Sequence, residues 1–311
     1  MFQPAGDYPI MSTKDPSNKV ISLQRRRGPK GKRPSKNTDG NSGSKARVIA
    51  ITSGKGGVGK TSIVANLGFA FTKLGKKVLI LDADLGLGNL DVLLGLAPKY
   101  NLSHVIMGEK KIEEILVEGP GHMKILPASS GIQELTHLTR VQKIDIFTQL
   151  DRLIDSVDIL LIDTAAGISP NVMDFNATAQ EIVVVVSPEP TSITDAYALM
   201  KVLSLKYSEK VCKLLVNMTT RPEEGREVFR QLHLVTDRFL DISSEYLGCI
   251  LYDAKVTKGV KNQKIVSELY PDAQSSGCFK DLARKIANSP PLNLPQGGSN
   301  LFWRHLVQNN L

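Results

Sequence analysis

Residues 53–62, SGKGGVGKTS, carry the side chains and spacing best suited to chemistry in this chain. They fit the P-loop pattern G-x-x-x-x-G-K-[ST] from Gly54 to Thr61. In this pattern, backbone N–H groups cradle phosphates, the lysine (here Lys60) reaches the β- and γ-phosphates, and the threonine hydroxyl holds Mg²⁺. The segment therefore predicts a phosphate-binding site made of Gly54, Lys55, Gly56, Gly57, Val58, Gly59, Lys60, Thr61 and Ser62.

The segments on either side of this loop have the character that the pattern requires. The apolar run 48–51 predicts a buried strand, and residues 62–70 predict a helix. A glycine-rich turn with only a structural role is the alternative interpretation. Strand, loop and helix all agree with the phosphate-binding pattern, which favours the functional interpretation.

Carboxylates follow two further apolar runs. Asp82 and Asp84 come after the run 77–81, and Asp163 comes after the run 158–162. Ligands of doubly wound sheets bind at the carboxyl ends of the strands, so these acids are expected beside the P-loop. A strand that ends in Asp is common by itself. Its position about 100 residues after a P-loop makes Asp163 the expected Walker B acid, which contacts Mg²⁺ through water.

The composition is typical of a cytosolic enzyme. The chain has 311 residues and 41% hydrophobic content, enough for one large domain or two small ones. No apolar run reaches the about 18 residues of a membrane span, and the N-terminus lacks the apolar core of a signal peptide. The three cysteines and five histidines show no metal-ligand spacing.

The net charge of the chain is concentrated near its N-terminus. Residues 1–47 hold 11 of the 39 Lys and Arg residues and 3 of the 31 Asp and Glu residues, which leaves 28 of each sign in residues 48–311. The segment is also rich in Pro, Gly, Ser and Asn, so we expect residues 1–46 to be disordered. It would contact nucleic acid, an anionic membrane surface or an acidic partner, or it is a solubilising tail.

Strands and helices are expected to alternate through residues 47–290. This order predicts an α/β fold, a doubly wound and mostly parallel sheet with helices on both faces. The expected strands are 47–52, 77–81, 123–127, 158–162, 181–186, 213–217 and 246–250. The expected helices are 62–74, 111–117, 134–155, 171–179, 193–208, 222–239 and 277–288.

The last residues, 291–311, are expected to form a linker and a short amphipathic helix. The linker is rich in Pro and Gly, and the segment 301–308 reads LFWRHLVQ. Such a helix suits a membrane interface, and the alternative is docking onto the protein's own domain. Its apolar residues share one face at helical spacing: Phe302, Trp303, Leu306 and Val307.

The loop resembles the deviant P-loop of the MinD/ParA family, because a second lysine, Lys55, follows its first glycine. The resemblance implies that Lys55 reaches the nucleotide of a partner subunit, and the alternative is a solvated surface charge. It also implies that Asp82 supports the Mg²⁺ shell and that Asp84 orients the attacking water. The implied cofactors are ATP and Mg²⁺, with Lys55 and Asp84 catalytic and Thr61, Asp82 and Asp163 around the metal.

Four longer stretches place the resemblance in the MinD branch, most closely with the flagellar number and placement ATPases of the FlhG or FleN kind. In that family an Asn at the end of a late strand recognises the adenine, which points to Asn217. The alternative is that Asn217 only forms the turn at the end of its strand. The short Asp-Gln-Ala motif with which FlhG proteins stimulate the GTPase FlhF is not found, and residues 15–20, DPSNKV, stand in that region. The similar stretches are 82–96, 126–131, 187–199 and 215–218.

The resemblance implies an ATP-bound homodimer that alternates with a monomer and uses slow hydrolysis as a timer. The implied role is control of flagellar number or placement, with a septum-site regulator of the MinD kind as one alternative. The other alternative is a ParA-like nucleoid-binding partition protein, in which the basic N-terminal segment would contact DNA. Implied partners are an FlhF-like GTPase, a flagellar switch protein or a flagellar transcription regulator. The protein would be cytoplasmic and would bind the inner membrane through its C-terminal helix in the ATP state.

Overall fold

The computed structural model describes residues 46–128, 138–209 and 211–290. The expected N-terminal segment, except residue 46, and the expected C-terminal helix lie outside the described residues. Within the described ranges, no helix combines the length and apolar character that a membrane span requires.

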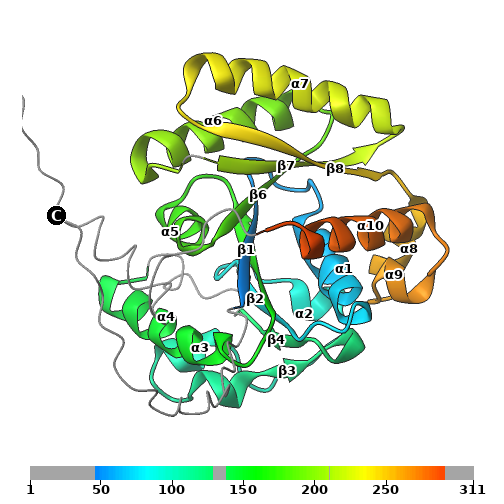
Figure 1. Cartoon of the computed structure of the whole chain (residues 1–311). Helices are drawn as coiled ribbons and strands as arrows, with labels where there is room; N and C mark the ends of the chain where they lie inside the picture. The colour runs from blue at the N-terminus through cyan, green and yellow to red at the C-terminus, as the bar shows by residue number, and fades with distance from the viewer. Residues whose placement is uncertain (1–45, 129–137, 210, 291–311) are drawn as a thin grey trace, which may run out of the picture. The chain divides into compact units, whose positions relative to one another are not determined.

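The described strands form one sheet (Figure 1). They are β1 (Arg47–Ser53), β2 (Val78–Ala83), β3 (Val117–Glu118), β4 (Lys124–Leu126), β5 (Ile159–Ala166), β6 (Glu181–Val186), β7 (Val211–Thr219) and β8 (Ser243–Leu251). Their order is β3-β4-β2-β5-β1-β6-β7-β8, and all neighbours pair in parallel except β3 and β4. The predicted mostly parallel, doubly wound sheet is confirmed.

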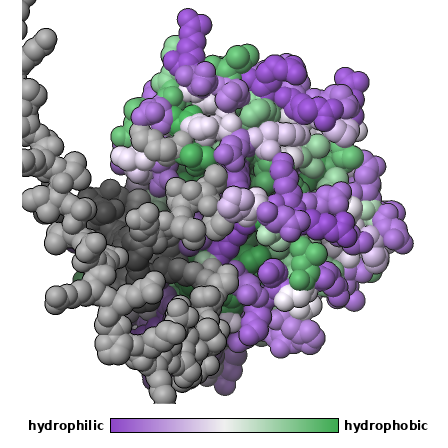
Figure 2. Space-filling view, viewed as in Figure 1, coloured by the Kyte–Doolittle hydropathy of each residue, from purple (hydrophilic) through white to green (hydrophobic). Residues whose placement is uncertain are grey.

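Helices cover both faces of this sheet, which explains why the central strands are apolar throughout. Every residue of β1 and β6 is buried. Figure 2 shows hydrophilic side chains interspersed with hydrophobic ones on the outside of the covering helices. The helices are α1 (Lys60–Lys73), α2 (Leu90–Leu93), α3 (Leu102–Ile106), α4 (Arg140–Ile154), α5 (Pro170–Thr178), α6 (Pro190–Tyr207), α7 (Pro222–Phe239), α8 (Ala254–Lys261), α9 (Val266–Leu269) and α10 (Gln274–Asn288).

The hydrophobic core lies on both sides of the sheet because successive strand residues face opposite ways. Ile49 and Ile51 of β1 pack in the cluster that contains α1 and α10, which lie side by side (Figure 1). Val48 and Ala50 point to the other face, in the cluster that contains α4. On that same face, α5, α6 and α7 cover β6 and β7.

The structure differs from the predicted elements where the chain forms short pieces. The helix predicted over 111–117 is a single 3₁₀ turn, Ile112–Ile115, and β3 begins after one extended residue, Leu116. Its two buried isoleucines stand three residues apart, which one 3₁₀ turn brings to the same side. The short helices α2, α3, α8 and α9 were not predicted. Helix α4 was predicted to begin at residue 134 but begins at Arg140. A capping box formed by Thr139 and Gln142 marks this start.

A buried ion network joins three strands at their amino ends. Glu181, at the start of β6, accepts from Arg47 of β1 and, at 2.7 Å, from Lys213 of β7. Arg47 also donates to the backbone carbonyls of Ile286 and Ser289, at the end of α10. Arg47 therefore belongs to the folded core and not to the basic segment that precedes it.

We expect Glu181→Ala to lower the free energy of unfolding by about 3–5 kcal/mol, because it leaves two buried cations without their carboxylate. The Glu181 side chain is 1% exposed. Urea denaturation followed by circular dichroism measures the loss. The matched control is Glu223→Ala, which breaks an exposed ion pair with Arg226 and is expected to cost less than about 1 kcal/mol. Equal losses in the two variants would contradict the assignment of a stabilising role to the network.

Candidate nucleotide-binding site

The P-loop connects the end of β1 to the start of α1. Gly57 has φ 79° and Gly59, the N-cap of α1, has φ 91°, conformations that glycine adopts without strain. No side chain caps α1, so its first backbone N–H groups remain for an anion. The loop therefore has the backbone geometry of a phosphate cradle.

Two other elements approach this loop so closely that only glycine fits. A Cβ on Gly54 would lie 2.1 Å from the backbone oxygen of Asp195 in α6. A Cβ on Gly59 would lie 2.6 Å from Nδ2 of Asn217 in β7. The loop is thus held between α6 and the end of β7. Of the other predicted loop residues, Gly56 is exposed, Val58 is buried and Ser62 is half-buried in the first turn of α1.

Lys60 is buried inside the loop. Its Nζ donates to Oγ of Ser53 at 2.9 Å, and the same hydroxyl donates to the carbonyl of Lys55 at 2.7 Å. Burial lowers the pKa of Lys60, and the charges of Asp163 and Asp84 oppose that shift. Ser53, which the sequence interpretation did not single out for a role, fixes the position of this cation.

Asp82 and Asp163 stand opposite each other in the register of β2 and β5. Each is 2% exposed, and Oδ1 of Asp163 has no hydrogen-bond partner although it is buried. Burial raises the pKa of Asp163 to about 7, while the hydroxyl of Thr61, which hydrogen-bonds to it, and the charge of Lys60 lower it. The pKa of Asp82 is raised by burial and by the charge of Asp163.

These residues fit a divalent cation. Two adjacent buried carboxylates, an unpartnered oxygen and the hydroxyl of Thr61 form a hard-oxygen donor set. The described residues hold no cluster of three or more His, Cys, Asp or Glu side chains arranged for a metal. Mg²⁺ matches this set, because it is usually bound by one or two carboxylates together with substrate phosphates and water.

The loop that carries Asp84 is organised by the carboxylate of Asp82. The backbone N–H groups of Asp84 and Leu90 donate to the two oxygens of Asp82, at 3.1 and 3.3 Å. Asp84 itself is half-buried, and its Oδ1 accepts from the N–H of Leu87 at 3.2 Å. Asp82 therefore also orders the segment that presents Asp84, a role that the sequence interpretation missed.

Lys55 extends to α6 in the same chain. Its Nζ contacts Oε2 of Glu189 and donates to Oγ1 of Thr191 at 2.9 Å. The side chain of Lys55 is 33% exposed and that of Glu189 is 62% exposed. The sequence interpretation did not assign a role to Glu189 or Thr191, although both lie in the stretch 187–199 that it singled out.

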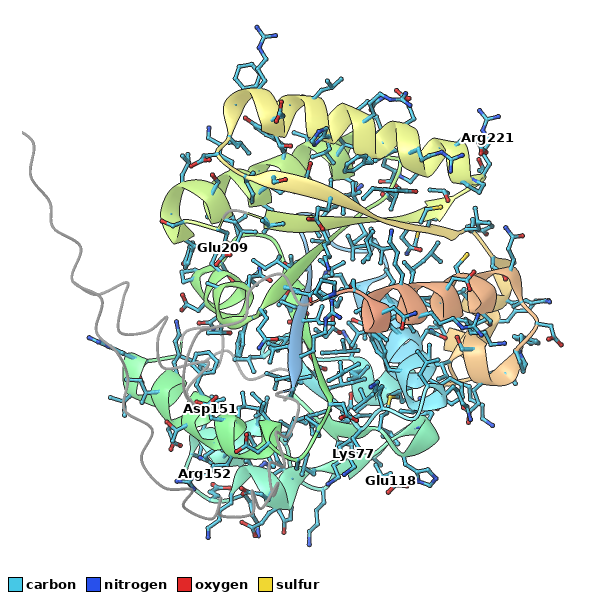
Figure 3. The ribbon with its side chains drawn as sticks, viewed as in Figure 1. Lys77, Glu118, Asp151, Arg152, Glu209 and Arg221 are labelled. Carbon is cyan, nitrogen blue, oxygen red and sulfur yellow. The ribbon has the colours of Figure 1, made fainter. Side chains whose placement is uncertain are left out.

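Asn217 is buried at the end of β7, where its Nδ2 donates to the carbonyl of Val58 at 2.8 Å. It lines a mainly apolar cavity of about 240 Å³. The lining residues come from the P-loop and the first turn of α1, from the ends of β7 and β8, from α8 with the two residues before it, and from α10. Arg221, the residue before α7, does not line this cavity, and its side chain points outward (Figure 3). The cavity is lined by Gly59, Ser62, Ile63, Asn217, Met218, Ile250, Leu251, Tyr252, Asp253, Val256, Thr257, Val260 and Phe279.

Comparisons with known proteins show which family the chain resembles. A family described as AAA domain matches residues 46–215. The antiactivator FleN of Pseudomonas aeruginosa is 46% identical over 263 residues, which cover 85% of this chain and 94% of the relative. The flagellum site-determining protein YlxH of Helicobacter pylori is 34% identical, over 84% of this chain and 90% of the relative.

Two solved structures are similar over most of the fold. The cell division ATPase MinD of Pyrococcus furiosus has a TM-score of 0.66 at 25% identity and covers 78% of this chain and 98% of its own. The septum site-determining protein MinD of Pyrococcus horikoshii, complexed with Mg-ADP, has a TM-score of 0.64 at 25% identity over 78% of this chain and 96% of its own.

Proposed function

We propose a function from one premise: the chain belongs to the MinD/ParA family of P-loop ATPases, in the branch of FleN and YlxH. In this proposal it binds ATP with Mg²⁺, dimerises in the ATP state and regulates the number or placement of flagella. The observation that carries the proposal is the meeting of the P-loop with Asp82, Asp84 and Asp163 in a chain 46% identical to FleN. The name of YlxH as a flagellum site-determining protein supports a target in flagellar placement, and the name of FleN as an antiactivator supports a regulatory role.

In this proposal each side chain of the site has a step. The loop and Lys60 bind the phosphates, and Thr61, Asp82 and Asp163 would hold Mg²⁺. The chemistry that bound Mg²⁺ supplies is neutralisation of phosphate oxygens during transfer. Asp84 lies on the loop after β2, beside these groups, and its carboxylate orients the water that attacks the γ-phosphorus. Slow hydrolysis at this site would time the return to the monomer.

Exposed apolar side chains at the ends of four strands support the dimer. Leu87, Ile168 and Tyr252 follow β2, β5 and β8, and Met218 is next to the last residue of β7, so all four lie near the carboxyl edge of the sheet. Between 41% and 69% of each residue is exposed. Apolar residues gathered around a ligand site favour an interface with another protein surface, and a second copy with its nucleotide facing the first is the proposed partner.

We expect Lys55→Ala to lower ATP turnover much more than it lowers ATP binding by the monomer. Lys55 points to α6 rather than into the loop, so its phosphate contact would be made across the dimer. One charged hydrogen bond contributes about 1.5–3 kcal/mol, which is roughly ten- to a hundredfold in rate. Binding of a fluorescent ATP analogue and phosphate release measure the two effects. Lys55→Arg keeps the charge but changes its shape and reach. Equal loss of binding and turnover in Lys55→Ala would show that the lysine acts within its own chain.

Membrane association in the ATP state is a further part of the proposal. It rests on the apolar stripe that includes Phe302 and Trp303, outside the described residues. We expect liposome pelleting to require ATP and to be lost in Trp303→Glu, because one short helix binds marginally and a dimer supplies two. A second variant lacks the basic residues 1–45 and tests whether they bind the membrane. It keeps Arg47, whose buried contacts belong to the folded domain. Pelleting that survives Trp303→Glu but disappears without residues 1–45 would make the basic segment the anchor.

The septum-site alternative remains because the similar solved structures are MinD proteins. Deletion of the gene separates the two functions. The proposal predicts altered flagellar number by electron microscopy, with normal cell division. Minicells with unchanged flagella would favour the septum-site function.

A further inference from the structure

Strand β7 contains one extra residue where it reaches the nucleotide site. Asn217 pairs with Ile250 and Thr219 pairs with Leu251, so Met218 has no counterpart in β8. Met218 has φ 62°, a left-handed conformation that is uncommon for residues other than glycine. This is a β-bulge, a feature that re-aims side chains beside functional sites.

The bulge turns two consecutive side chains toward the same loop. In a regular strand, neighbouring residues face opposite sides of the sheet. Here Nδ2 of Asn217 lies 2.6 Å, and Cε of Met218 3.6 Å, from the position that a Cβ of Gly59 would take. Asn217 is held there by its bond to the carbonyl of Val58. Met218 lies next to it and is 41% exposed.

Met218 also lines the apolar cavity beside the P-loop, together with Tyr252, Val256 and Val260. Its volume of about 240 Å³ is smaller than the about 300–1,000 Å³ of sites for whole drug-sized ligands, which suits one flat ring of a larger ligand. A polarisable thioether makes favourable contacts with aromatic rings. Strained backbone of this kind persists where the surroundings impose it and clusters at ligand sites.

We propose that Met218 is a positioning residue for the nucleobase: the bulge places its thioether against the flat face of the ring, while Asn217 stays fixed to the P-loop. This inference rests on the proposed nucleotide-binding function. It adds a residue that sets affinity for the base and not for the phosphates.

The test compares Met218→Gly, Met218→Asn and Met218→Leu by calorimetry with two probes, Mg-ADP and Mg-tripolyphosphate. Gly and Asn both accept left-handed backbone, so each is expected to fold with a melting temperature of the ligand-free protein at or above that of the wild type. Both are expected to weaken ADP binding roughly tenfold and to leave tripolyphosphate binding unchanged. Met218→Leu keeps an apolar side chain and is expected to stay within about threefold of wild type.

Unchanged ADP affinity in Met218→Gly and Met218→Asn would overturn the inference while leaving the proposed function intact. Equal weakening of ADP and tripolyphosphate would also overturn it, because Met218 would then support the loop rather than the base. A wild-type protein that binds neither probe would overturn the proposed function, and the inference with it.

Discussion

An Asp84→Ala variant is expected to bind ATP and dimerise normally, yet hydrolyse ATP about 10³-fold more slowly than the wild type. A positioned carboxylate that orients or deprotonates an attacking group typically contributes 10²- to 10⁴-fold. Asp84 is half-buried on the loop after β2. The phosphate contacts come from other residues, so removing this carboxylate leaves binding in place and traps the ATP dimer.

Phosphate release gives the rate of this variant and light scattering gives its mass with ATP. Asp84→Asn is the matched control, because an amide oxygen still accepts the N–H of Leu87 while the charge is lost. We expect Asp84→Asn to be as slow as Asp84→Ala. Normal hydrolysis in either variant, or a failure to dimerise, would remove Asp84 from its proposed role.

A Lys60→Ala variant is expected to lose ATP-driven dimerisation altogether. Its ammonium is the buried cation of the loop, 9% exposed as a residue, and is fixed by Ser53. Losing a charged contact to phosphate costs about 1.5–3 kcal/mol per hydrogen bond, and an ammonium makes several. We therefore expect ATP affinity to fall by more than about 10²-fold.

Fluorescence titration with labelled ATP measures this loss, and light scattering measures the dimer. An exposed lysine just after the same helix gives the control, Lys76→Ala, which is expected to behave as the wild type. A Lys60→Ala variant that still forms a dimer with ATP would show that phosphate binding by this loop does not control dimerisation.

The sequence predicted the parts of the site that depend on local spacing. The P-loop and its flanking strand and helix follow one another along the chain, so their order alone placed Lys60 and Thr61. Asp82 and Asp163 were expected together because parallel strands bring their carboxyl ends to one edge. The sequence did not predict that Asp82 and Asp163 are direct partners in the register of β2 and β5. That pairing depends on which strands are neighbours, and two separate apolar runs do not specify it.

Local sequence patterns did not predict contacts between segments that are far apart in the chain. Glu189 meets Lys55 across 134 residues, and no periodicity links the two positions. The cavity near Asn217 needs α8, a helix of eight residues whose weakly apolar face was not recognised. Met218 lies just beyond the predicted strand 213–217, and its place in β7 was not expected because a bulge changes pairing without changing composition. Arg47 was expected at the start of the strand 47–52, but its partners Glu181 and Ile286 lie 134 and 239 residues away in the chain and no local pattern indicates them.

The central claim is that ATP, and not ADP, converts this chain from a monomer to a dimer. Multi-angle light scattering of the full chain tests it directly, with no nucleotide, with Mg-ADP and with Mg-ATP, using Asp84→Ala to hold the ATP state. The account predicts the chain mass of 34.0 kDa in the first two conditions and twice that mass with ATP. A mass of 34.0 kDa in all three conditions, in a protein that binds ATP, would contradict it.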